Sequence, residues 1–236
     1  MIEEAKEPKL KAWYNGPYLS QLIYEFKSVK KALDKPIRAC VSDAYASSAE
    51  QAKGTCLSTR IEGGVIEEGN TLLLRPVDVK CLVKGIMIAG EKVPYAKAGD
   101  TAEISVQFNC ELDTALIKSG MVLSSIEYPI NIITKFRAQI MTFNLLTPIT
   151  LGHNVIIYCS SLKVPAKFSK LEKLVIGETE KKRPKCLLSN QTAFVIITTI
   201  ERVCLDLFQN YKGLGRIAIR DDSGTLATGI IVELLS

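Results

Sequence analysis

Residues 213–234 decide the fold, and they read Gly-Leu-Gly-Arg-Ile-Ala-Ile-Arg-Asp-Asp-Ser-Gly-Thr-Leu-Ala-Thr-Gly-Ile-Ile-Val-Glu-Leu. Ile217 and Ile219 alternate with small or charged residues. After the turn, a second set of residues is expected to share one face: Leu226, Thr228, Ile230, Val232 and Leu234. A period of two is typical of strands that are buried on one side. We therefore expect a β-hairpin that closes the fold.

The turn of this hairpin, 221–224, carries two adjacent carboxylates. Asp and Ser side chains bond to their own backbone in turns, and Gly accepts a positive φ. We expect Asp221 and Asp222 to project between flanking arginines such as Arg220. A solvated surface turn without a function is the alternative interpretation, because turns favour these residue types anyway.

Composition indicates a folded protein of one large or two small domains. The chain has 236 residues, of which 47% are hydrophobic and 23% are charged, so it can form real cores. The net charge of +5 is mildly basic. Such a charge fits an RNA or ribosome surface but does not require one.

Cysteine usage indicates a reducing compartment. The seven cysteines are odd in number, form no C-x-x-C pair and mostly lie among apolar residues, as buried thiols do. The first residues have no apolar signal core, and no apolar run reaches about 18 residues. We expect a soluble, cytoplasmic protein with no membrane contact.

Catalytic and metal-binding motifs are missing from the sequence. It contains no G-x-x-x-x-G-K-[ST] loop, H-E-x-x-H, C-x-x-C or G-x-S-x-G motif. His153 is the single histidine and is expected to be a surface turn residue. We expect no catalytic residue, metal or cofactor in this chain, and a binding platform is the favoured interpretation.

Strand patterns dominate the chain after a helical start. Residues 13–26 predict a short helix with an apolar stripe formed by Leu19, Leu22, Ile23 and Phe26. The expected strands are 37–43, 55–61, 71–75, 79–88, 101–108, 121–124, 134–143, 154–160, 164–176, 193–199 and the hairpin. Turn signals recur between them, which favours an all-β barrel or sandwich. A boundary is expected within 124–131, a charged exposed loop at 177–185 with RNA contact as one interpretation, and a helical turn at 205–211.

Five motifs in order resemble the second and third domains of translational GTPases of the elongation-factor-Tu and elongation-factor-1-alpha class. They are Thr59-Arg-Ile-Glu-Gly-Gly-Val-Ile-Glu-Glu-Gly69, Ala98-Gly-Asp100, Phe136-Arg-Ala-Gln-Ile140, Arg183-Pro-Lys-Cys-Leu187 and Leu214-Gly-Arg-Ile-Ala-Ile-Arg-Asp221 with Thr225 and Gly229. A Trp13-Tyr-Asn-Gly-Pro segment resembles the end of the preceding GTPase domain. The resemblance covers roughly 34–235.

Within the class, the chain resembles most the HBS-one-like ribosome-rescue GTPases that work with Pelota. The stretches that carry this are 34–43, 83–86 and 134–140, followed by 147–152. Eukaryotic release factor 3 is the nearest competitor. Elongation factor 1-alpha itself comes third, because a histidine of its third domain is not found near Ser160 and Ser161.

The resemblance implies two tandem antiparallel β-barrels, 35–127 (domain II) and 128–236 (domain III), after a linker and domain remnant at 1–34. It implies a monomeric fragment that binds a Pelota-type, tRNA-shaped partner and the ribosome, while GTP and Mg²⁺ belong to a GTPase domain of the parent protein. The implied partner-binding residues are Arg60, Glu62, Glu67, Glu68, Ser160, Ser161, Lys163, Arg220, Asp221 and Asp222. The alternatives are the same region of release factor 3 and a stand-alone RNA-binding β-protein, and an enzyme is a third hypothesis.

Overall fold

The computed structural model describes residues 9, 12–14, 16–27, 31–46, 54–110, 112–176 and 179–235. The chain divides into two compact units, Met1–Lys31 and Ala32–Ser236. In the first unit, helix α2 (Leu19–Tyr24) begins after Pro17 and contains no buried residue. The predicted stripe is exposed, from 39% at Leu22 to 77% at Phe26. No described helix is both long and apolar enough to cross a membrane.

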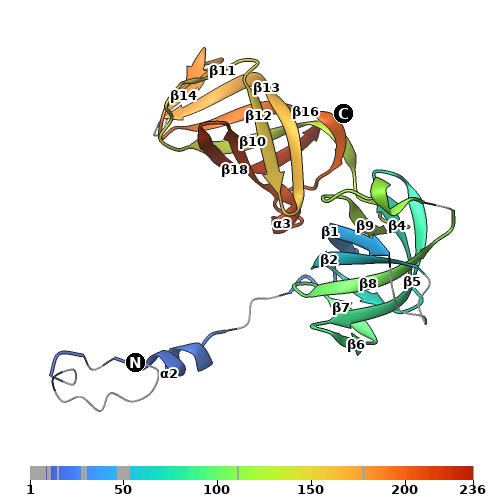
Figure 1. Ribbon diagram of the computed structural model, residues 1–236. Coiled ribbons are helices and arrows are strands. Elements are labelled where there is room, and N and C mark those ends of the chain that lie inside the picture. The colour runs from blue at the N-terminus through green and yellow to red at the C-terminus, as the bar shows by residue number, and fades with distance from the viewer. Residues whose placement is uncertain are drawn as a thin grey trace. The chain divides into compact units, whose positions relative to one another are not determined.

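The second unit contains two closed antiparallel barrels, which confirms the predicted fold class (Figure 1). The first barrel has the strand order β4-β9-β1-β2-β8-β5, and the β4–β5 pairing closes it. A short strand, β6, pairs with the end of β5, and β3 pairs with β7 in a separate two-stranded sheet. The bounds are β1 Arg38–Ala46, β2 Thr55–Gly63, β3 Val65–Glu67, β4 Thr71–Arg75, β5 Val79–Ile88, β6 Glu91–Val93, β7 Tyr95–Lys97, β8 Thr101–Phe108, the 3-10 helix η1 Thr114–Leu116 and β9 Val122–Ser125.

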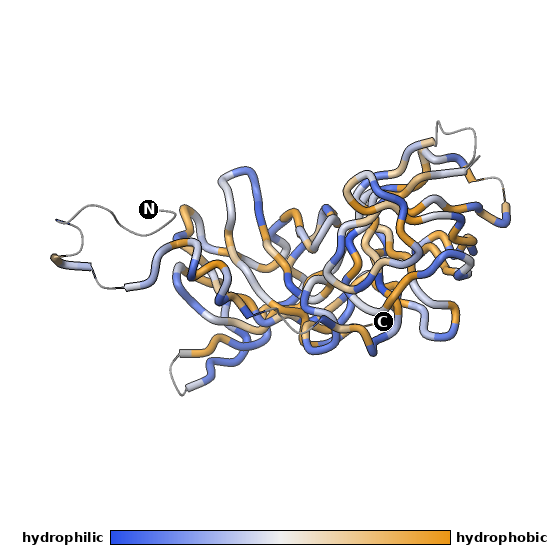
Figure 2. Tube along the Cα trace, turned by 90° about the horizontal axis from the view of Figure 1, so that it is seen from below, coloured by the Kyte–Doolittle hydropathy of each residue, from blue (hydrophilic) through white to orange (hydrophobic). Residues whose placement is uncertain are grey.

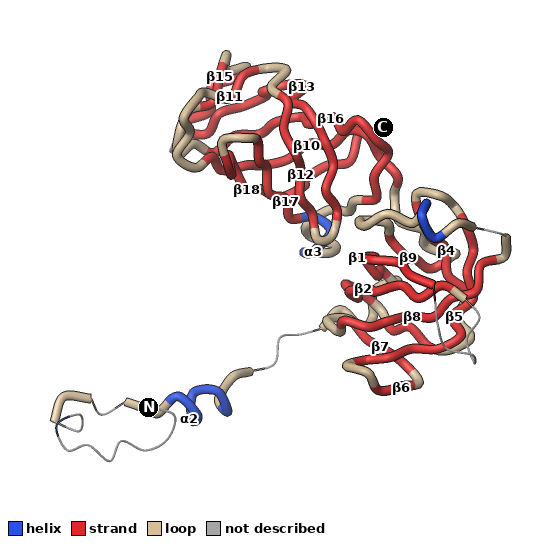
Figure 3. Tube along the Cα trace, viewed as in Figure 1, coloured by secondary structure: helices blue, strands red, loops and turns tan. Residues whose placement is uncertain are grey.

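The second barrel repeats this plan with the order β12-β17-β18-β10-β16-β13, closed by the β12–β13 pairing. Strand β14 pairs with the end of β13, and β11 pairs with β15. Strands therefore make up most of the described chain beyond residue 37 (Figure 3). The bounds are β10 Ile132–Thr142, β11 Ile149–Thr150, β12 Asn154–Cys159, β13 Leu162–Ile176, β14 Thr179–Lys182, β15 Cys186–Leu187, β16 Thr192–Cys204, helix α3 Lys212–Gly215, β17 Arg216–Asp221 and β18 Gly224–Leu235.

Each barrel has its own apolar core. Leu57, Ile61, Leu74 and Ile104 are fully buried in the first core, and Phe136 and Phe168 are the largest side chains of the second. Hydrophobic and hydrophilic residues interleave along the strands (Figure 2), as expected when one face of each strand points inward. The alternation in sequence therefore gives each barrel its buried inner face.

A third, smaller cluster joins the two barrels. Residues from β1, β9, the connection between the barrels, the end of β16 and the α3 region pack together: Cys40, Val122, Ile130, Cys204, Tyr211 and Leu214. Arg38 is buried beside this junction, 3.9 Å from Asp206 (Nε to Oδ2). Arg75 donates a hydrogen bond to the carbonyl of Ile130 at 2.6 Å. We call this region the barrel junction.

The closing hairpin is present, and Leu226 and Leu234 of the predicted face contact the second core, but the other three residues of that face do not. Register shifts leave Leu226 and Val232 as extra residues in β18. Because each bulge reverses the in-and-out pattern of the strand, the buried residues include Ala227 and Ile231. Thr228, Ile230 and Val232 point outward and line surface grooves instead.

One further local prediction is corrected, because strand β14 lies in the segment 177–185 that was predicted as a loop. The helical turn predicted at 205–211 is present, since the Tyr211 amide donates a 3.0 Å hydrogen bond to the Leu207 carbonyl four residues earlier. Helix α3 follows this turn, and β17 begins at Arg216. All seven cysteines are free, and five of them are buried.

Candidate partner-binding surfaces

The implied partner-binding residues of the first barrel do not form one cluster. Arg60 is 56% exposed on β2 and lies 3.4 Å from Glu62 (Nε to Oε1). Glu67 ends β3 and is exposed. Glu68 follows it and forms a 3.1 Å ion pair with Lys92. Arg60 and Glu68 thus belong to ion pairs at the surface, where a single pair contributes about 0–1 kcal/mol.

Three of the implied residues lie at the barrel junction. The Glu62 carboxylate occupies the space beside Gly213, where an added Cβ would lie 2.2 Å from Oε2. The Ser161 carbonyl accepts a 2.6 Å hydrogen bond from the Ser119 hydroxyl. Burial raises the pKa of the Cys40 thiol to about 12, although a hydrogen bond with Ser160 lowers it in part. Glu62, Ser160 and Ser161 thus contact the neighbouring barrel.

Lys163 and Arg220 come together on the outer face of the second barrel. They flank one aromatic ring, Tyr158, with the Lys163 Nζ 5.9 Å and the Arg220 Cζ 5.8 Å from its centroid. Tyr158 lies on the central strand β12, directly opposite Lys163 on β13 and Ala218 on β17. Ile156 lies opposite Arg220 in the same way. Pairing across three strands, and not sequence proximity, builds this cluster.

The surface around Tyr158 is basic. The outward positions of β12, of β13 up to residue 167 and of β17 carry four cations and no carboxylate: Lys163, Lys167, Arg216 and Arg220. We call these four residues and Tyr158 the Tyr158 strip. Cations over an aromatic face gain about 0.5–1 kcal/mol at exposed sites and remain free to pair with an anion. The strip therefore suits an acidic protein surface or a phosphate group.

The hairpin turn beside the strip is held by its own hydrogen bonds. Asp221 accepts hydrogen bonds from the Ser223 amide at 2.8 Å and its hydroxyl at 2.6 Å. The Asp221 Oδ2 also lies 3.4 Å from His153 Nε2. Partial burial raises the pKa of Asp221, but the Ser223 hydrogen bonds outweigh this, so the pKa lies below its usual value. Asp222 is exposed at the tip.

These contacts differ from the expectation that both aspartates project between flanking arginines. Asp221 contacts His153, whereas Arg220 lies over Tyr158. His153 was predicted to lie at the surface, but its side chain is only 21% exposed. Tyr158 was not singled out from the sequence. Its outward position on a strand whose alternate residues are buried is the signal that identifies it.

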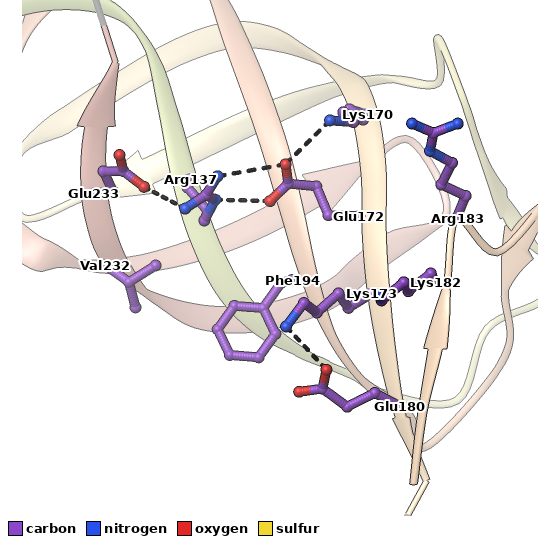
Figure 4. Close-up of a pocket in the computed structure, with 10 residues that line it drawn as sticks. All are labelled: Arg137, Lys170, Glu172, Lys173, Glu180, Lys182, Arg183, Phe194, Val232 and Glu233. Atoms are coloured by element: carbon purple, nitrogen blue, oxygen red, sulfur yellow. Dashed lines mark hydrogen bonds and ion pairs between the residues drawn. The ribbon is translucent and has the colours of Figure 1, made fainter.

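A groove of about 510 Å³ lies elsewhere on the second barrel (Figure 4). Its walls come from β10, β13, β14, β16 and β18. Arg137 forms ion pairs with both Glu172 (2.6 Å, Nε to Oε2) and Glu233. Partial burial raises the pKa of Glu172, but hydrogen bonds from Arg137 and Lys170 lower it further than burial raises it. Among the described residues, no group of three or more metal-ligating side chains comes together.

Comparisons with known proteins agree with this architecture. Residues 135–232 match the family described as GTP-eEF1A C-terminal domain-like. Protein HBS1 of Drosophila melanogaster is 32% identical over 99% of the chain, and elongation factor 1-alpha of Archaeoglobus fulgidus is 27% identical over 98%. The chain spans 34% of the first protein and 54% of the second.

A solved structure agrees as well. The structure of sup35 complexed with GDP superimposes with a TM-score of 0.79 and 25% identity, covering 95% of this chain and 54% of that one. The chain therefore resembles, over its length, the barrel domains of translational GTPases of the elongation-factor-1-alpha class. Residues 135–232, which match the family model, lie within the second β-barrel of the chain.

Proposed function

We propose that this chain is the partner-binding part of a translational GTPase of the HBS1 kind, and that it acts with a Pelota-type protein in the rescue of stalled ribosomes. The proposal extends two findings, which are that the chain forms two β-barrels and that it is similar to HBS1 over 99% of its length. The Tyr158 strip is the observation that carries it. Four cations without a carboxylate form a surface that an acidic partner can recognise.

The division of labour follows from the residues present. Barrels with paired surface charges and no phosphate-binding loop motif suit recognition. GTP and Mg²⁺ would be bound by another part of the parent protein, and this chain would hydrolyse no GTP by itself. In this proposal the fragment is a cytoplasmic monomer, and the Tyr158 strip and the hairpin turn with Asp221 and Asp222 face the body of the partner.

The first barrel has a smaller part in this proposal. Arg60, Glu67 and Glu68 are its exposed candidates for the acceptor-end side of the partner. Glu62, Ser160 and Ser161 would act indirectly, because they hold the two barrels together at the junction. Their replacement should disturb the junction before it disturbs partner binding.

The test is isothermal titration calorimetry of the purified chain with Pelota and, in a separate experiment, with the termination factor. The K163E/R220E variant should bind Pelota about tenfold or more weakly, because two attractive contacts become repulsive. The control K80E/K84E changes the net charge equally at exposed positions of the first barrel. It should bind within about twofold of the unchanged chain.

The other outcomes decide between the alternatives. Binding to the termination factor alone would favour a function like that of eukaryotic release factor 3. Binding to RNA with a steep salt dependence, and to neither protein, would favour a stand-alone RNA-binding protein. Turnover of GTP by this chain would overturn the view that it only binds partners.

A further inference from the structure

The groove on the second barrel is built by two irregularities of its strands. The pairing of β13 with β16 skips Glu172, and the pairing of β10 with β18 skips Val232. Each skipped residue is an extra residue of a bulge, and bulges redirect side chains away from the regular pattern. Both extra side chains line the groove (Figure 4). The hollow is thus a consequence of two separate insertions on different strands.

The end of strand β14 is fixed against the bulge at Glu172. The Arg183 amide donates a 2.8 Å hydrogen bond to the Glu172 carbonyl. Arg183 has a φ of +50°, a left-handed conformation that is uncommon for a residue with a side chain. This bond holds the end of β14 beside β13, where the side chains of Lys182 and Arg183 line the groove.

The charges of the groove are largely satisfied within it. Glu172 pairs with Arg137 and Lys170, and Glu233 pairs with Arg137. On the other wall, Lys173 and Glu180 form a 2.9 Å pair. Among the lining residues, Lys182 and Arg183 are the cations for which the structure describes no carboxylate partner. Two cations are therefore available to a ligand.

The remaining lining is apolar. Phe194 and Val232 are half-buried and form the hydrophobic part of the groove (Figure 4). Phe194 lies opposite Lys173 on β13 and Gln139 on β10, so its ring is on the outer face of the sheet. A half-buried aromatic side chain beside free cations is suited to a ligand with an apolar anchor and a nearby carboxylate.

We propose that this groove binds an extended acidic protein segment, with an apolar side chain against Phe194 and Val232 and carboxylates against Lys182 and Arg183. An RNA backbone fits less well, because it carries a phosphate at every nucleotide and some of these would meet Glu172, Glu180 and Glu233, whereas a peptide can place its carboxylates only beside Lys182 and Arg183. This site is separate from the Tyr158 strip. The inference goes beyond the proposed function and adds a second protein contact to the barrel.

The probe is a short fluorescent peptide of alternating leucine and aspartate, titrated into the full chain by fluorescence anisotropy. The K182E/R183E variant should bind it about tenfold more weakly. K181E/K185E is the matched control, since it makes the same change in net charge on the same segment with residues that do not line the groove. This control should bind within about twofold of the unchanged chain.

Two further measurements test the apolar anchor and the class of ligand. F194S should weaken binding of the leucine-aspartate peptide. It should leave binding of a serine-aspartate peptide unchanged, since that peptide has no apolar anchor. Equal losses in K182E/R183E and K181E/K185E would mean that net charge alone attracts the peptide, and would overturn the proposal. Tighter binding of a short single-stranded RNA, lost in K182E/R183E, would overturn it in favour of an RNA site. Neither result depends on whether Pelota binds the Tyr158 strip.

Discussion

Replacing Asp206 by asparagine should destabilise the protein strongly, because Asp206 balances a buried charge at the barrel junction. The side chains of Arg38 and Asp206 are each only 7% exposed. Burial lowers the pKa of Arg38, while Tyr211 and Asp206 raise it in part. D206N keeps an oxygen that can accept from the Leu207 amide, now at 2.8 Å, but it removes the charge and replaces the other carboxylate oxygen by an NH2 group, which can only donate.

The size of the effect follows from the geometry. Two unit charges 3.9 Å apart attract by about 4 kcal/mol at an effective dielectric constant of about 20. The asparagine recovers part of this, because a neutral side chain costs less to bury. We expect a loss of about 3 kcal/mol, within the range of about 3–5 kcal/mol for breaking buried pairs. That corresponds to a melting temperature lower by about 6–12 °C for a domain of this size.

The assay is differential scanning calorimetry, with urea unfolding as a second measure. D78N is the control: the Arg75–Asp78 pair is shorter, at 2.9 Å, but Asp78 is 48% exposed. It should cost less than about 1 kcal/mol, because water screens exposed pairs. The R38M/D206N double variant should lose less than the sum of the single losses. Additive losses, or a D206N loss below about 1 kcal/mol, would refute the role of the pair.

The strand alternation predicted most of the barrel strands. The bounds of β4, β5 and β8 are those that the sequence predicts, because each strand has one buried face and ends at a turn signal. Strand β14 was missed because all four of its residues are exposed. A strand without a buried face leaves no alternation to read, and its pairing with β13 alone defines it.

Bulges break the alternation of buried and exposed residues within the hairpin. The pattern of β18 was read with one uninterrupted period of two, yet it contains extra residues at Leu226 and Val232. A bulge changes neither composition nor hydrophobicity, so a sequence pattern gives no signal for it. The groove lined by Val232 and Glu172 therefore could not be predicted, although it is a consequence of these bulges.

The candidate residues fall into two groups, those whose contacts lie within one barrel and those whose contacts reach the other barrel. Lys163 and Arg220 were assigned from the resemblance, and strand pairing brings them to the same ring. Glu62 and Ser161 were assigned in the same way, but they contact the other barrel. Packing between two barrels depends on contacts far apart in sequence, which no local pattern encodes. Whether any of these residues contacts a partner stays a prediction.

Three more outcomes follow from the geometry. E172Q should lower stability most at neutral pH. The pKa of Glu172 is lowered in the folded protein, so its carboxylate stabilises the fold at every pH above the pKa of a glutamate in the unfolded chain, about 4.3. The difference in melting temperature from the unchanged chain should therefore shrink as the pH falls below about 4; a constant difference would contradict this. In thiol titration of the native protein, exposed Cys110 should react first and the five buried thiols only on unfolding. The last prediction compares two glycines of α3. A Cβ at Gly215 would lie 2.3 Å from backbone atoms of Phe208, whereas one at Gly213 would meet the flexible end of Glu62. Because backbone cannot move aside cheaply, G215A should cost about 3 kcal/mol or more. G213A should cost less and be largely rescued by E62A, since the obstacle is then gone. Equal losses in both glycine variants, with no rescue by E62A in urea unfolding, would show that the Glu62 carboxylate does not occupy this space.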